Sequence, residues 1–130
     1  MQNLDVKDKA GNAKRAKEYL ERVLNQLLTD YQTTSSERDQ LAVWEETQEF
    51  TILGAIEIFA TDIRGYAFQA IADARLEENI VDSLHQLNIF DIPYFADWYF
   101  SIELHYPQIK RYVEKLNYLR LLVIEYIKNY

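Results

Sequence analysis

The sequence predicts an all-α protein, a single-domain helical bundle of five or six helices. Apolar residues recur at three- and four-residue steps along most of the chain, which is the period of amphipathic helices. Strand signals are poor, because there is no Asn-Gly or Asp-Gly turn and no clean alternation between turn clusters. The 130 residues, 48% of them apolar and only five of them Gly or Pro, suffice for one domain over 1–130 with its own core.

The first helix is predicted from about Asp5 or Asn12 to Tyr31, with residues 1–11 frayed. TTSS follows at 33–36, and Ser36 with Asp39 three residues later resembles a capping box in which Asp replaces the usual Glu or Gln. We therefore expect a second helix to begin there. The first helix carries one apolar face: Ala16, Leu20, Val23, Leu24, Leu27 and Leu28.

The second helix is unusual because its apolar stripe runs from Leu41 to Ala74 and crosses Gly65 without losing phase. The pattern allows one helix over about 36–77 with a kink near Gly65, and leaves open whether it is one helix or two. A helix with apolar residues on two faces is normally covered on both, by other helices or by another subunit. The residues on the opposite face are Val43, Phe50 and Phe68.

The remaining helices follow from local signals. A short helix is predicted over 78–90, and a further helix over about 92–105, where Asp91 and then Pro93 mark its start. A last helix, from Pro107 to about Lys128, is apolar almost all round. Such a helix is typical of the centre of a bundle or of an oligomer seam.

Aromatic residues make up 14% of the chain and cluster in DIPYFADWYF at 91–100. On a helix over 92–105, one stripe points inward and forms core. Tyr94 and Asp97 share another side with Tyr106, and this side is predicted to contact a partner. The inward stripe consists of Phe95, Trp98, Tyr99 and Ile102.

Charge is unevenly distributed within the net −7. Residues 37–103 carry three basic and fourteen acidic side chains, or −11, whereas 1–36 carry +1 and 104–130 carry +3. The acidic middle argues against direct binding of nucleic acid. It either neutralises the basic tail within the fold or docks onto a basic partner.

Several classes of site are excluded by composition. The absence of Cys excludes disulfides and thiolate metal sites. Three glycines cannot build a phosphate loop or a dinucleotide fingerprint, and no nucleophile elbow is present. No cofactor, catalytic residue or metal site is therefore predicted, and the protein is not expected to be an enzyme. With no signal peptide and no membrane span, a cytoplasmic protein is expected.

The predicted function is a non-enzymatic protein–protein interaction module: an assembly subunit, an adaptor, or an inhibitor or immunity-type binder. Self-association, as a dimer, is also predicted. One alternative is an acidic mimic of nucleic acid that inhibits a basic nucleic-acid-binding protein. Another is a metal- or ligand-binding bundle that uses Glu45, Glu49, Asp82 and His85. The predicted partner-binding residues are Trp44, Glu45, Glu46, Glu49, Tyr94, Asp97, Trp98 and Tyr99.

Overall fold

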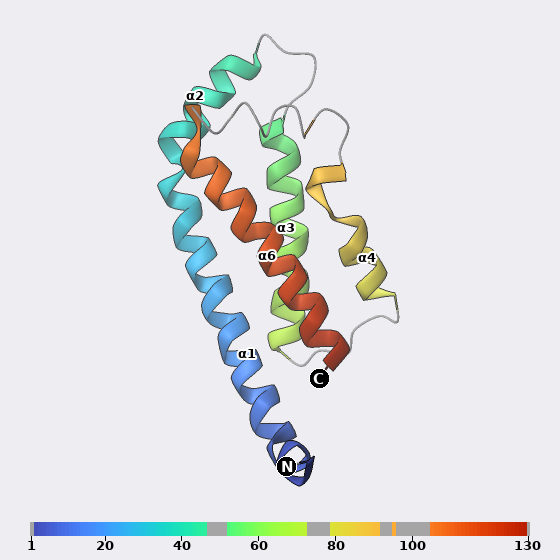
Figure 1. The fold of residues 1–130 in the computed structure, drawn as a ribbon. Helices are drawn as coiled ribbons and strands as arrows, with labels where there is room; N and C mark the ends of the chain where they lie inside the picture. The colour runs from blue at the N-terminus through green and yellow to red at the C-terminus, as the bar shows by residue number, and fades with distance from the viewer. Residues whose placement is uncertain (1, 47–51, 73–78, 92–94, 96–104, 130) are drawn as a thin grey trace.

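A computed structural model of the chain describes residues 2–46, 52–72, 79–91, 95 and 105–129, and over these ranges it is helical, with no strand (Figure 1). The all-α prediction is confirmed. None of the described helices is long and apolar enough to cross a membrane. The elements are α1 (Gln2–Thr33), α2 (Ser35–Glu45), α3 (Ile52–Ile71), α4 (Ile80–Gln86), the 3-10 helix η1 (Ile89–Asp91) and α6 (Pro107–Asn129).

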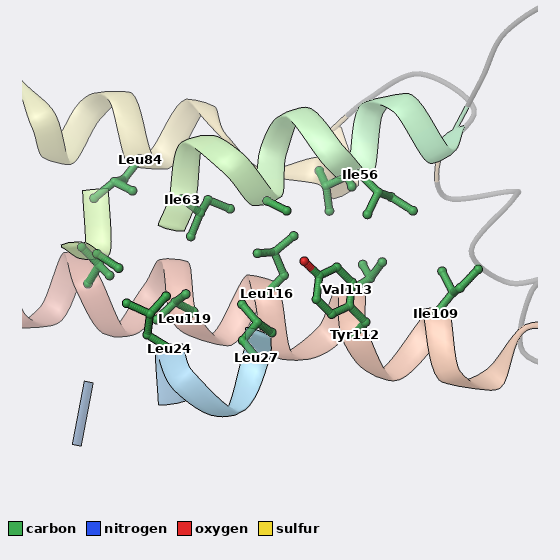
Figure 2. Packing of buried hydrophobic residues seen from close by; sticks show 14 of the residues in the cluster. Leu24, Leu27, Ile56, Ile63, Leu84, Ile109, Tyr112, Val113, Leu116 and Leu119 are labelled. Atoms are coloured by element: carbon green, nitrogen blue, oxygen red, sulfur yellow. The ribbon is translucent and has the colours of Figure 1, made fainter. Parts of the chain in front are cut away.

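The last helix, α6, is the centre of the bundle. It packs against α1, α2, α3 and α4, and α1 also packs against α3 (Figure 1). The core lies where α1, α3 and α6 meet, and α4 adds to it from the side (Figure 2). This is the central position that the nearly all-round apolar character of 107–128 predicts. The largest fully buried side chains include Leu20, Leu24 and Leu27 of α1, Ile63 of α3, and Ile109, Val113, Leu116 and Leu119 of α6.

The first helix is longer than predicted. It begins at Gln2 rather than at Asp5 or Asn12, and its first turns extend beyond the ends of α3 and α6 (Figure 1). Fraying of residues 1–11 stays a prediction.

Of the two possibilities that the sequence leaves open for 36–77, the described residues show two helices rather than one with a kink near Gly65. α2 ends at Glu45 and α3 begins at Ile52, so the break lies before α3, while Gly65 lies inside that helix. The physical reason is the Glu45 side chain, whose Oε1 accepts hydrogen bonds from the backbone N–H groups of Ile52 (2.8 Å) and Leu53 (3.0 Å). These are among the first N–H groups of α3, which have no partner within their own helix.

A second glutamate of α2 caps another helix in the same way. The carboxylate of Glu37 accepts hydrogen bonds from the backbone N–H groups of Gln108 (2.8 Å) and Ile109 (3.1 Å), in the first turn of α6. A negative charge is favourable there because the N-terminus of a helix carries partial positive charge. The eleven-residue α2 thus holds the starts of both α3 and α6 in place.

The capping box predicted at Ser36 and Asp39 is wrong. α2 begins at Ser35 with Thr34 as its N-cap, and no side-chain hydrogen bond caps it. The Thr34 hydroxyl instead donates to the carbonyl of Tyr31 (2.7 Å) and accepts from Nε of Arg38 (2.8 Å). The turn between α1 and α2 is therefore stabilised by contacts with the end of α1.

A buried arginine fixes α4 to the bundle. Arg120 of α6 is only 5% exposed, and its Nη1 donates to the carbonyl of Leu84 near the end of α4 (3.1 Å). Its Nε and Nη2 both donate to Oδ1 of Asn117 (3.2 and 3.0 Å). Burial lowers the pKa of the Arg120 guanidinium, and the negative charge of Asp91 opposes this effect. The guanidinium thus stabilises a helix end that has unsatisfied carbonyl groups.

Candidate interaction surface

One face of α3 is exposed although it carries large apolar side chains. Gly54, Ile58, Thr61, Gly65 and Phe68 follow one another at steps of four and three residues, so they lie on a single face of the helix. We call these five residues the α3 outer face. Ile58 is 63% exposed and Phe68 is 52% exposed, and a Cβ atom added to Gly65 would meet nothing within 4 Å.

The other side of α3 explains why this face points outward. Ile52, Ile56, Ile63, Ala67 and Ala70 are all buried and belong to the central core. Figure 2 shows Ile56 and Ile63 directed from α3 toward α6. Since α3 is fixed in the bundle by this buried stripe, its outer face is left open to contact other molecules.

Two acidic residues flank Ile58, the more exposed of the two large apolar side chains on this face. Ile58 lies in a shallow hollow that is lined also by Gly54, Glu57, Thr61 and Asp62, and both Glu57 and Asp62 are exposed. Glu57 Oε1 accepts a hydrogen bond from the hydroxyl of Tyr31 on α1 (3.3 Å). The surface therefore presents an apolar side chain between two carboxylates, one of which is oriented by a neighbouring helix.

The predicted partner-binding residues are only partly described. Trp44, which is 46% exposed, and the exposed Glu46 lie at the end of α2. The prediction that Glu45 contacts a partner is wrong. Its side chain is 5% exposed and caps α3 rather than forming part of an acidic rim. The other predicted residues lie outside the described part of the chain: Glu49, Tyr94, Asp97, Trp98 and Tyr99.

The aromatic segment contributes to the core through Phe95, as predicted. Phe95 is fully buried, and its ring lies edge-on to that of Phe90, with the centroids 5.6 Å apart. Sequence reasoning missed Ile58. The signal that could have found it is the spacing of four and three residues on the side of α3 opposite the main apolar stripe.

A second surface feature is an open groove between α1 and α6 with a volume of about 360 Å³. We call it the α1–α6 groove. Two contacts between the helices cross it: the Tyr19 and Tyr118 hydroxyls are 2.7 Å apart, and Nζ of Lys115 is 2.7 Å from Oδ2 of Asp30. Its full lining is Tyr19, Arg22, Val23, Gln26, Leu27 and Asp30 of α1 with Lys115 and Tyr118 of α6.

The polar contacts of the groove stabilise the ionised form of Asp30. Burial acts to raise the pKa of this carboxyl, but hydrogen bonds from Lys115 and Gln26 outweigh it and hold the pKa below its ordinary value. The Asp30 carboxylate is therefore already paired with Lys115 and does not add a free negative charge to the groove. The guanidinium of Arg22 lies 5.6 Å from the centre of the Tyr19 ring and is exposed, which leaves it as a cation on the rim.

No described region gathers groups suited to holding a metal. Among the described residues, no three His, Asp or Glu side chains come close enough to bind a metal ion. Asp82 and His85 of α4 are both exposed, and Glu45 already accepts two backbone hydrogen bonds. No protein-family model, no curated protein and no solved structure matches this chain.

Proposed function

We propose that the protein is a non-enzymatic protein–protein interaction module that binds its partner through the α3 outer face. The observation that carries this proposal is the position of Ile58, 63% exposed on a rigidly packed helix. Single exposed apolar residues are common on protein surfaces. Here Ile58 and Phe68 instead share one face with two glycines that allow a partner to approach the helix closely.

The chemistry of the face defines the partner surface that fits it. Burying the exposed parts of the Ile58 and Phe68 side chains would contribute about 1–2 kcal/mol each. Glu57 and Asp62 favour a partner with positive charge around an apolar recess, and charge complementarity of this kind increases the rate and specificity of association. The net −11 of residues 37–103 acts in the same direction over a longer range.

The proposal is tested by affinity capture from the native host with the full chain as bait. We expect Ile58→Glu to lose the partner, because it places a third negative charge in the apolar contact. Val43→Glu is the matched control, since Val43 is 66% exposed on α2 and undergoes a similar apolar-to-acidic change. The captured partner should dissociate as salt is raised.

A photo-crosslinking residue at position 58 gives an independent measurement. It should form a covalent adduct with the same partner, and one at position 43 should not. Capture of an unchanged set of proteins by Ile58→Glu would show that the α3 outer face is not the binding surface.

A further inference from the structure

We infer that the α1–α6 groove binds the α3 outer face of a second copy of this chain, so that the molecules associate head to tail. The inference rests on the proposed function, because it uses the same α3 outer face. It adds a second site, the groove, and it names the partner. Three properties of the described surfaces support it: apolar fit, charge and direction.

The apolar parts of the two surfaces match. Half-buried Val23 lines the groove between its two cross-contacts, and the fully buried Leu27 lies beneath it. The two cross-contacts are eleven residue steps apart on α1, from Tyr19 to Asp30, or about 16 Å along the helix. The 360 Å³ of the groove is at the low end of the volumes of ligand sites, about 300–1,000 Å³. An open groove of this size has room for the side chain of Ile58.

The charges of the two surfaces are opposite. Arg22 and Lys115 line the groove, with Lys115 already paired to Asp30, whereas Glu57 and Asp62 flank Ile58. The same division holds for whole elements: α1 and α6 together carry eleven basic and seven acidic residues (+4), and α2 and α3 carry two basic and five acidic residues (−3). A second copy therefore meets attraction when its acidic face approaches the groove.

The two surfaces open in different directions. α3 packs against both α1 and α6 through its buried side, so its outer face points away from the two helices that form the groove. The α3 outer face of a molecule therefore cannot reach the α1–α6 groove of the same molecule. When two molecules dock, one α3 outer face and one α1–α6 groove remain free. Such heterologous contacts build rings or open chains, depending on the rotation between successive copies. Direct pairing of two α3 outer faces would instead bring Glu57 and Asp62 of both copies together, which disfavours a two-fold dimer.

The test is sedimentation velocity of the full chain and two variants from micromolar to millimolar concentration. Ile58→Glu removes the face and leaves the groove, and Arg22→Glu removes a rim cation and leaves the face. We expect the wild-type chain to form species that grow with concentration and shrink with salt, and each variant alone to associate about tenfold more weakly. An equimolar mixture of the two variants should form a dimer and nothing larger, because one intact face then meets one intact groove.

Controls separate this result from general effects of charge or folding. Lys14→Glu makes the same charge reversal on an exposed residue of α1 outside the groove and should associate like the wild type. Gln26→Trp fills the groove without a change of charge and should behave like Arg22→Glu. Circular dichroism verifies that each variant is folded.

The inference is overturned if the wild-type chain stays monomeric at millimolar concentration, if Arg22→Glu associates as strongly as the wild type, or if the mixture stays monomeric. A monomeric wild type whose host partner is lost in Ile58→Glu would leave the proposed function standing and remove only this inference. A host partner that Ile58→Glu retains would remove the proposed function instead.

Discussion

The hydroxyl of Tyr112 is buried without a hydrogen-bond partner among the described residues. The residue is 3% exposed, its ring lies 5.4 Å from that of Tyr31, and its hydroxyl points toward α3 (Figure 2). The neighbouring Tyr31, by contrast, donates its hydroxyl to Glu57 and accepts from Nη1 of Arg38 (3.1 Å). A buried polar atom without a partner costs stability, whereas a paired one does not.

Tyr112→Phe should therefore make the protein more stable. Removing the unpaired hydroxyl eliminates a desolvation cost of about 1 kcal/mol, measured as an increase in the free energy of unfolding in urea. Tyr31→Phe is the matched control and should lower stability by about 1 kcal/mol, because it breaks two hydrogen bonds. A loss of stability in Tyr112→Phe would mean that a bound water satisfies this hydroxyl.

The same residue predicts a dependence on alkaline pH. Burial raises the pKa of Tyr112, so the folded chain resists ionisation at a pH where the unfolded chain ionises. Ionisation of Tyr112 therefore favours the unfolded chain. The free energy of unfolding is unaffected below the ordinary tyrosine pKa of about 10 and falls as the pH rises above it. Urea titrations between neutral pH and pH of about 11 should show a smaller loss in Tyr112→Phe than in the wild type. Equal losses in the two would assign the alkaline effect to other groups.

At the scale of elements, α2 orders the bundle through two carboxylates. Glu45 caps the start of α3 and Glu37 caps the start of α6. Each capping interaction of this kind is worth about 1–2 kcal/mol. A short helix with few buried residues of its own thereby determines where two longer helices begin.

Glu45→Ala and Glu37→Ala should each lower the free energy of unfolding by about 1–2 kcal/mol, since each leaves N–H groups of a helix start without an acceptor. The matched controls are Glu46→Ala and Asp39→Ala, which remove the same charge from exposed positions on or beside α2. They should change stability by less than about 0.5 kcal/mol. Equal losses in Glu46→Ala and Glu45→Ala would show that the charge of this region, and not the cap, is what matters.

These caps explain which elements could be predicted from sequence. The extent of α6 follows from local periodicity and from Pro107, and its predicted end differs from the observed one by a single residue. α4 is shorter than the helix predicted over 78–90: it ends at Gln86, and the 3-10 helix η1 follows at Ile89–Asp91. The break between α2 and α3 could not be predicted from sequence, because the apolar stripe keeps its phase from Leu41 onward. The break depends instead on a contact made by Glu45. Ser36 and Asp39 have the local pattern of a cap, but contacts with α1 through Thr34 place the helix start elsewhere.

At the scale of the whole molecule, the candidate interaction surface could be predicted from sequence only in part. The two-faced apolar pattern placed Val43 and Phe68 opposite the main stripe, and both side chains are exposed. That another subunit covers this side stays a prediction. The prediction for Glu45 is wrong because a glutamate next to a second glutamate, Glu46, gives no sign in the sequence that its side chain is buried. The α1–α6 groove could not be predicted, since its lining comes from two helices that are about 90 residues apart in the chain.

The central position of α6 predicts that the whole molecule loses stability together. Leu116 is 1% exposed and lies in the core between α3 and α1 (Figure 2), so Leu116→Ala should cost about 3 kcal/mol by leaving a cavity. Because α6 packs against α1, α2, α3 and α4, native-state hydrogen exchange should show a similar loss of protection in α1 and α3. Leu121→Ala is the control on the same helix; Leu121 is 46% exposed, and its loss should cost less than about 0.5 kcal/mol. If Leu116→Ala reduced protection in α6 alone, the helices would be stabilised independently and α6 would not be the element that joins them.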